Sequence, residues 1–223
     1  MFARNLAIFA RVPTLYLSAD TDEWTVRQGV AATITGYQLE KIEQDITSED
    51  DDEARMFEKW YAGQLRQADH IDWCFRSDID VEFIANRVAA YAELRGEYPV
   101  LIVVDNLRNV VEDMEAQYSE LEGICRELQS LARTTKAHVM ALHHVVGDKE
   151  DGREQIGMRD LLGKIGKIPE QVLGLSWDSP ESVLVNIPKN RGGKRGQIHG
   201  LGMDYSRQTV SGYLRGSNVT AAA

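Results

Sequence analysis

The apolar run Val100–Val104, with the sequence VLIVV, constrains the fold of this chain more than any other segment. A strand covered on one face alternates apolar and polar residues, whereas a strand covered on both faces is apolar throughout. Other short apolar runs alternate along the chain with longer segments whose apolar residues recur at helical spacing. The sequence therefore predicts an α/β fold with a mainly parallel central sheet and helices on both of its faces.

Helices and strands are expected to alternate through one domain that spans residues 1–220. Acidic residues that can cap a first turn and glycines that can end a last turn mark several helix boundaries. The expected helices cover residues 3–10, 22–35, 52–67, 80–95 and 114–136. The expected strands cover residues 14–18, 71–75, 100–104 and 139–142, with 171–177 and 182–187 at the far edge of the sheet. Residues 221–223 are interpreted as a cloning remnant.

The composition limits what the whole surface can do. A net charge of −10 over 223 residues argues against a protein that coats nucleic acid with its entire surface. Cys74 and Cys125 have no metal-ligand spacing and are interpreted as reduced, buried thiols of a cytoplasmic protein. No apolar stretch has the length of a membrane span, so we expect no membrane partner.

The charged residues are concentrated in particular segments. The acidic run Glu49–Glu53 is interpreted as a solvated loop that begins a helix, with a metal site as the alternative. Basic residues gather in segments 149–167 and 189–195. A protein that is acidic overall but has two basic segments is suited to local contact with phosphates, so we expect both to bind the DNA backbone. The predicted DNA-binding residues are Arg153, Arg159, Lys164, Lys167, Lys194 and Arg195.

Polar side chains follow three of the predicted strands, where ligands bind in an open parallel sheet. Asp20 follows strand 14–18, Asp105 ends the central run, and His144 follows strand 139–142. Each residue has a simpler interpretation: Asp105 as a turn acid, Asp20 as a helix N-cap and His144 as a structural histidine. Because carboxylate oxygens suit Mg2+ or Mn2+, the sequence predicts Asp105 and Asp20 as metal ligands and as catalytic residues, with His144 assisting.

The segment Ile187–Gly196 reads IPKNRGGKRG. On an extended backbone Lys189 and Arg191 point to the same side, and the glycines behind them allow a turn. These two charges either act together on a partner or are solvated charges of a hairpin.

The chain resembles the ATPase core of DnaB-type hexameric helicases and their RecA-fold relatives, including those of phages. The resemblance lies in the order of three features: the strand that ends at Asp105, the strand that precedes His144, and the Lys189-x-Arg191 pair. The resemblance covers nearly the whole chain. It implies that Asp105 holds magnesium and that His144 senses phosphate or DNA. It also implies that Asp20, one methylene shorter than the family's common glutamate, activates water. The Lys-x-Arg pair would reach into a neighbouring subunit's nucleotide site, in a homo-oligomer such as a six-membered ring.

No GxxxxGK[ST] phosphate loop occurs in the sequence. In the family this loop joins the first strand to the first helix, and residues 1–6 resemble the helix that follows it. We expect negligible ATP turnover by this chain alone, because the loop supplies the lysine and N–H groups that clamp the phosphates. Either the protein starts here with a changed activity, or the missing part is encoded elsewhere.

The remaining groups predict a function in DNA processing. A divalent metal held by carboxylates, next to basic segments that hold DNA, is sufficient for phosphodiester hydrolysis. The sequence thus predicts a metal-dependent, structure-specific DNA nuclease that acts on forked, branched or single-stranded DNA. Two alternatives stay open: an ATP-dependent DnaB-like helicase subunit whose phosphate loop is supplied upstream, and a non-catalytic DNA-binding ring or adaptor.

Overall fold

The computed structural model describes residues 1–110, 117–145, 152, 155–196 and 198–212. Its centre is a four-stranded, all-parallel sheet in the order β2-β1-β3-β4. The strands are β1 (Thr14–Ser18), β2 (Ile71–Cys74), β3 (Leu101–Asp105) and β4 (His138–Ala141). Because β3 lies between β1 and β4, the central position predicted for the apolar run is confirmed.

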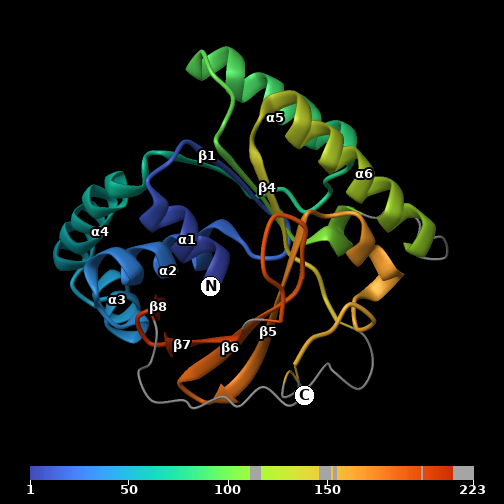
Figure 1. The fold of residues 1–223 in the computed structure, drawn as a ribbon. Helices are drawn as coiled ribbons and strands as arrows, with labels where there is room; N and C mark the ends of the chain where they lie inside the picture. The colour runs from blue at the N-terminus through green and yellow to red at the C-terminus, as the bar shows by residue number, and fades with distance from the viewer. Residues whose placement is uncertain (111–116, 146–151, 153–154, 197, 213–223) are drawn as a thin grey trace.

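Helices cover both faces of this sheet, as predicted. α1 (Phe2–Ala10) and α2 (Glu23–Thr35) pack on one face, and α5 (Val81–Arg95) and α6 (Gln117–Thr135) pack on the other (Figure 1). Alternate strand residues serve the two cores: Tyr16 and Val103 join α1 and α2, whereas Leu17 and Val104 join α5 and α6. Burial on both faces explains why Leu101–Val104 of β3 form a continuous apolar run.

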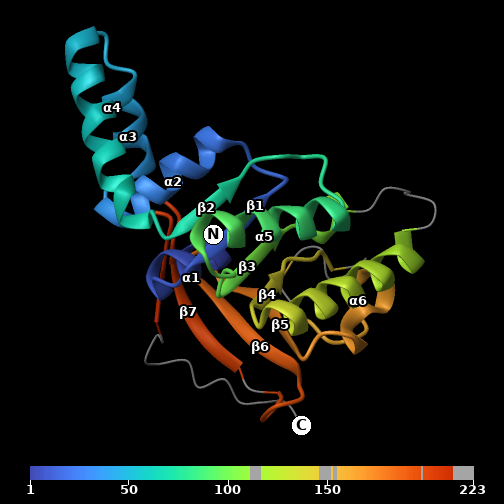
Figure 2. The same cartoon turned by 90° about the horizontal axis from the view of Figure 1, so that it is seen from above.

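Two further helices form a hairpin that projects from the body (Figure 2). These are α3 (Leu39–Ile46), which the sequence did not predict, and α4 (Asp51–Leu65). Ile42 and Tyr61 bury against α2 and hold the hairpin in place. Asp50 accepts hydrogen bonds from the backbone N–H groups of Asp52 and Glu53, so the acidic run begins a helix as expected.

The C-terminal strands form a second sheet, which corrects one expectation. β5 (Gln171–Ser179), β6 (Ser182–Asn190), β7 (Ile198–Asp204) and β8 (Thr209–Ser211) pair in this order, and all pairs are antiparallel. The placement of segments 171–177 and 182–187 at the far edge of the parallel sheet is wrong. The short β5–β6 connection is the cause, because a tight turn can join only antiparallel neighbours.

The turn between β7 and β8 fastens the second sheet to the first helices. The Gln208 carbonyl oxygen accepts hydrogen bonds from Asn5 Nδ2 at 2.8 Å and Thr33 Oγ1 at 2.9 Å. Arg207 Nε donates to the carbonyl oxygen of Gly36 at 3.0 Å. The two sheets are therefore joined through α1 and α2, whose residues come from the other end of the chain.

The connecting segments include three 3₁₀ helices: η1 (Arg66–Ala68), η2 (Leu107–Val110) and η4 (Leu162–Lys167). η4 packs against α6, where Gly163 lies against Leu121. Among the described residues, no helix combines the length and the hydropathy that a membrane span requires.

Candidate functional site at the strand ends

The parallel sheet brings the carboxyl ends of β1, β3 and β4 to one edge. Ser18 pairs in register with Asp105, and Val104 pairs with Ala141. Asp105 is the last residue of β3, while Asp20 follows β1 by two residues and His144 follows β4 by three. The three predicted catalytic residues therefore lie along the edge where open parallel sheets bind ligands.

Asp105 is held in a fixed orientation by its neighbours. Its Oδ2 atom accepts a hydrogen bond from the Tyr16 hydroxyl at 2.8 Å, and its carbonyl oxygen accepts one from the backbone N–H of Ala19, also at 2.8 Å. Burial raises the pKa of Tyr16, and the Asp105 charge raises it further. The phenol therefore stays protonated and donates a hydrogen bond to the carboxylate.

Asp20 is exposed and lies beside the central strand end. Asn106 Nδ2 donates to Asp20 Oδ2 at 3.3 Å, which links the segment after β1 to the residue that follows Asp105. Asp22, and not Asp20, caps α2, because its carboxylate accepts from the Thr25 N–H at 2.9 Å. The interpretation of Asp20 as the helix N-cap is therefore wrong, and its carboxylate faces the strand-end edge instead.

The two histidines after β4 differ in exposure. His143 is half-buried and His144 is exposed. Within the described part of the chain, no hydrogen bond joins His144 to Asp105 or Asp20. An assisting role for His144 stays a prediction that depends on a ligand between them.

The carboxylates of Asp105 and Asp20 are the candidate ligands of a divalent cation at this edge. Carboxylate oxygens are ligands that Mg2+ and Mn2+ prefer, whereas the Asn106 amide oxygen already accepts a hydrogen bond from the Arg108 N–H at 2.9 Å. No cluster of three or more His, Cys, Asp or Glu with metal-binding geometry occurs among the described residues. A cation here would thus share two protein carboxylates and take its other ligands from water or substrate. Cys74 and Cys125 are free and only partly buried, and burial raises the pKa of Cys125 to about 11.

Lys189 and Arg191 point to the same side of β6, as the sequence indicated. The Lys189 ammonium donates to the carbonyl oxygens of Gly166 at 2.9 Å and Lys167 at 2.6 Å. Arg191 donates through Nη2 to the same Lys167 oxygen at 2.9 Å and pairs through Nη1 with Glu170 at 2.9 Å. In the single chain, both side chains bind the end of η4.

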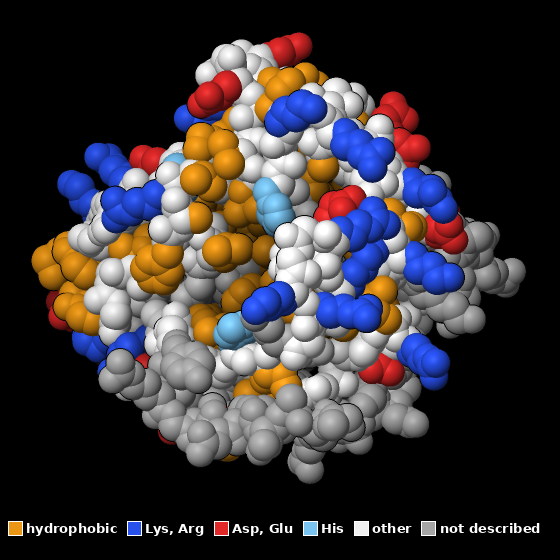
Figure 3. Space-filling view, viewed as in Figure 1, with side chains coloured by type: hydrophobic (Ala, Val, Ile, Leu, Met, Phe, Trp, Pro, Cys, Tyr) orange, Lys and Arg blue, Asp and Glu red, His pale blue; other side chains and the backbone are white. Residues whose placement is uncertain are grey.

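The other predicted DNA-binding residues differ in how far the structure describes them. Arg159, Lys167, Lys194 and Arg195 are exposed, and the last two lie in the turn that follows β6. Arg153 and the side chain of Lys164 lie outside the described residues. Figure 3 shows Lys and Arg side chains gathered over the side of the molecule that carries α6 and η4.

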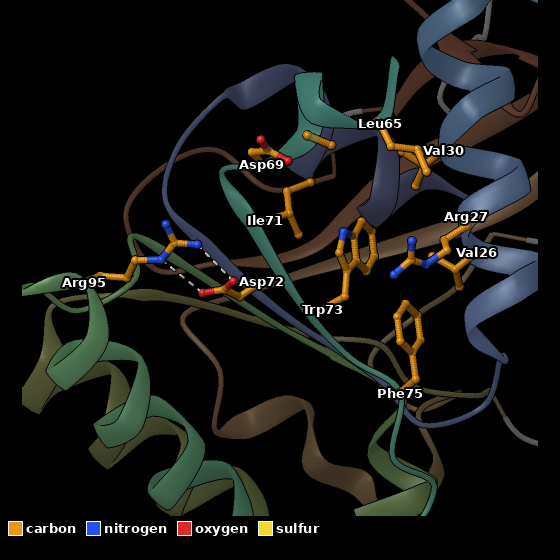
Figure 4. Close-up of a pocket in the computed structure, with 11 residues that line it drawn as sticks. Val26, Arg27, Val30, Leu65, Asp69, Ile71, Asp72, Trp73, Phe75 and Arg95 are labelled. Carbon is orange, nitrogen blue, oxygen red and sulfur yellow. Dashed lines mark hydrogen bonds and ion pairs between the residues drawn. The ribbon is translucent and has the colours of Figure 1, made fainter. Parts of the chain in front are cut away.

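A hollow of about 370 Å³ opens elsewhere, at the outer edge of β2 (Figure 4). The rings of Trp73 and Phe75 stack along it at 6.0 Å, and Arg95 pairs with Asp72 at its rim. None of the predicted site residues lines this hollow. The hollow is linked to the strand ends through a ring contact, because the Trp73 ring, which lines it, lies 4.8 Å from the ring of Tyr16.

Sequence reasoning missed Tyr16 and Asn106. Tyr16 reads as one more apolar residue of a strand, and its bond to Asp105 crosses between strands 89 residues apart. Asn106 directly follows the predicted acid, so its position was the one available signal.

Solved structures with the same fold include helicase and recombinase domains. One is a chain described as a DnaB-like replicative helicase, solved in a study of its interactions with primase. It matches with a TM-score of 0.81 at 15% identity, and the match covers 96% of this chain and 55% of the helicase chain. A second solved chain, described as an ATPase domain, matches with a TM-score of 0.76 at 16% identity over 95% of this chain and 82% of its own. The RadB recombinase matches with a TM-score of 0.55 at 13% identity. This chain thus spans about half of that helicase chain, and the likeness is one of fold.

Sequence comparison identifies closer relatives. The chain is 34% identical over 200 residues to the Gene 65 protein of Mycobacterium phage D29, over 86% of this chain and 83% of that protein. It is 33% identical over 200 residues to the Gene 65 protein of Mycobacterium phage L5, over 86% of this chain and 72% of that protein. Residues 3–150 match the profile of a family described as AAA domain. By that match the chain belongs to the AAA domain family.

Proposed function

We propose that this chain is a DNA-processing domain of the helicase-type AAA family, with its chemistry at Asp105. One observation carries the proposal: Asp105 ends the central strand, is oriented by Tyr16 and lies next to the Asn106–Asp20 link. Asp105 and Asp20 would hold Mg2+ or Mn2+, which polarises a phosphate and lowers the pKa of a bound water.

The first candidate reaction is hydrolysis of a phosphodiester bond in forked, branched or single-stranded DNA. The exposed cations Arg159, Lys167, Lys194 and Arg195 would hold the backbone by charge. Asp20 is open to solvent and is suited to accept a proton from the attacking water, while His144 can donate one to the leaving oxygen. This reaction needs no phosphate loop, and the sequence contains none.

The second candidate is ATP-driven unwinding of DNA as a subunit of a homo-oligomer such as a hexameric ring. Family membership and the fold shared with the solved ATPase domain favour it. A phosphate loop from another segment would have to complete the site, since no such motif occurs in this sequence. Lys189 and Arg191 would then exchange the carbonyl oxygens of η4 for a neighbour's nucleotide.

A strand-cleavage and unwinding assay separates the candidates. Purified protein is incubated with 5′-labelled forked and linear DNA, with and without Mg2+ and with and without ATP. Cleavage that needs metal alone supports the nuclease, and unwinding that needs ATP supports the helicase subunit. Binding of DNA without either reaction points to a non-catalytic adaptor, and robust ATP turnover by this chain alone contradicts the nuclease.

Asp105→Asn tests the site itself. The amide keeps the size of the side chain but loses the charge that binds a hard cation. We expect metal-dependent cleavage to fall by about a hundredfold or more, with DNA affinity and folding retained. Asp51→Asn removes one exposed carboxylate from the acidic run and serves as the matched control. A large loss with Asp51→Asn and none with Asp105→Asn would place the metal in the acidic run.

A further inference from the structure

A second hollow, which we call the α6–η4 pocket, lies away from the strand ends. Its volume is about 190 Å³, and its lining residues come from α6, the end of η4 and the turn after β6. They are Glu122, Arg126, Gln129, Lys167, Ile168 and Arg191. Three of these six side chains are cations and one is an anion, whereas the whole chain carries a net charge of −10. The pocket is thus a positive region on an acidic protein.

Hydrogen bonds to the backbone hold this group of cations together. The Lys167 carbonyl oxygen accepts from Lys189 and Arg191, and the Ile168 carbonyl oxygen accepts from Gln129 Nε2 at 3.2 Å. These bonds tie the end of η4 to both β6 and α6. Burial lowers the pKa of Lys189, and the neighbouring Arg191 charge lowers it further. Lys189 and Arg191 therefore repel each other at the end of η4, and an anion beside them would relieve this repulsion.

The carboxylates nearby leave part of this charge uncompensated. Arg126 pairs with Glu122 at 2.5 Å, and Arg191 pairs with Glu170 at 2.9 Å. No carboxylate of the described residues pairs with Lys167. A guanidinium has five N–H donors, and Arg126 makes its described bond through Nη2. Arginine donors and the Lys167 ammonium are therefore available to a further oxygen-rich anion.

We infer that the α6–η4 pocket binds a phosphate group between Arg126, Lys167 and Arg191. Guanidinium donors match the geometry of phosphate oxygens, and an ammonium adds a point charge. The pocket is smaller than the roughly 300 Å³ at which small-molecule sites begin, so it suits one phosphate and not a whole nucleotide. Lys194 and Arg195 extend the positive surface beyond Arg191. A nucleic-acid strand that seats one backbone phosphate here is the ligand we assign, which rests on the proposed function in DNA.

A double variant and a matched control test this assignment. Arg126→Gln with Lys167→Gln removes two positive charges from the pocket. Arg55→Gln with Lys59→Gln removes two from the exposed face of α4, at the far side of the molecule (Figure 2). Affinity for a fluorescent single-stranded oligonucleotide is measured across salt concentrations, with thermal unfolding as the check on folding.

The salt dependence gives the expected result. Each phosphate that a protein neutralises adds about 0.7 to the slope of log affinity against log salt for a single strand. If the pocket variant no longer neutralises one or two phosphates, its slope should fall by about 0.7 to 1.4 units, while the slope of the α4 variant stays unchanged. Equal slopes for the wild type and the pocket variant, or equal reductions in both variants, overturn the assignment.

A titration with inorganic phosphate separates this inference from the proposed function. We expect phosphate to shift the backbone amide resonances of Gln129 and Ile168 in the wild type but not in the pocket variant. If the wild type binds no DNA yet shows these shifts, the proposed function fails and the phosphate site stands. If the shifts occur while the DNA slopes of the wild type and the pocket variant agree, the source is a free phosphate and the nucleic-acid assignment is wrong. If phosphate causes no shifts, the pocket is not a phosphate site.

Discussion

At the scale of single residues, Arg4 shows how closely the core restricts its neighbours. Arg4 is 8% exposed and donates to the Gln208 side chain, and a Cβ on Gly29 would lie 2.5 Å from its Nη1 atom. We therefore expect Gly29→Ala to destabilise the protein by about 1–3 kcal/mol, because overpacking outweighs the better helix propensity of alanine. Gly63→Ala is the control: its Cβ meets nothing within 4 Å and should stabilise α4 by about 0.5–1 kcal/mol. Urea unfolding measures both changes, and shifts in the same direction would contradict the packing argument.

At the scale of elements, Asp204 organises the β7–β8 turn. Its carboxylate accepts from the Ser206 hydroxyl at 2.7 Å and from the N–H and Nη1 groups of Arg207, which together lower its pKa to about 2. Because this pKa lies below the ordinary 3.8, the stabilisation is fully present above that value and is lost as pH falls through about 2. The difference in free energy of unfolding between the wild type and Asp204→Asn should be constant from about pH 7 to 5 and should shrink towards pH 2. Denaturant unfolding measured across this pH range checks the prediction. A difference in stability that does not change with pH would contradict the role of the Asp204 carboxylate in the turn.

The elements also show where the sequence was informative. β3 was predicted because an apolar run that is buried on both faces is a local signal, and α2 because Asp22 and Gly36, at φ 73°, mark its ends. The separate second sheet was missed because pairing between strands is not local. The position of Asp105 was predictable for the same reason as β3, whereas its contact with Tyr16 needed the register between strands.

At the scale of the whole molecule, charge is separated between two ends. The α3–α4 hairpin, residues 39–65, contains nine acidic and three basic residues and so has a net charge of −6. Residues 189–195, in contrast, contain four basic and no acidic residues. The hairpin projects on one side and α6 and η4 lie on the other (Figures 1 and 2). We expect head-to-tail self-association that weakens with salt, since screening at about 0.5 M leaves little long-range attraction. Sedimentation velocity should show a lower mean mass at high salt, and reversing the charges of Asp51 and Asp52 should remove the low-salt species. A mass that is the same at all salt concentrations would argue against this contact.

The fastening of the β7–β8 turn to α1 also sets an order of events during protein synthesis. Asn5 accepts a hydrogen bond from the Val210 N–H, and these residues are 205 positions apart. At roughly 5–20 residues per second, a ribosome needs about 10–40 s to add the segment that separates them. Until then α1 has been synthesised but lacks this hydrogen-bond partner. The side chains of Arg4 and Thr33 likewise lack their hydrogen bonds to Gln208 and stay solvated. α1 therefore reaches its final packing only after β8 has been synthesised, although α1 is made about 200 residues earlier.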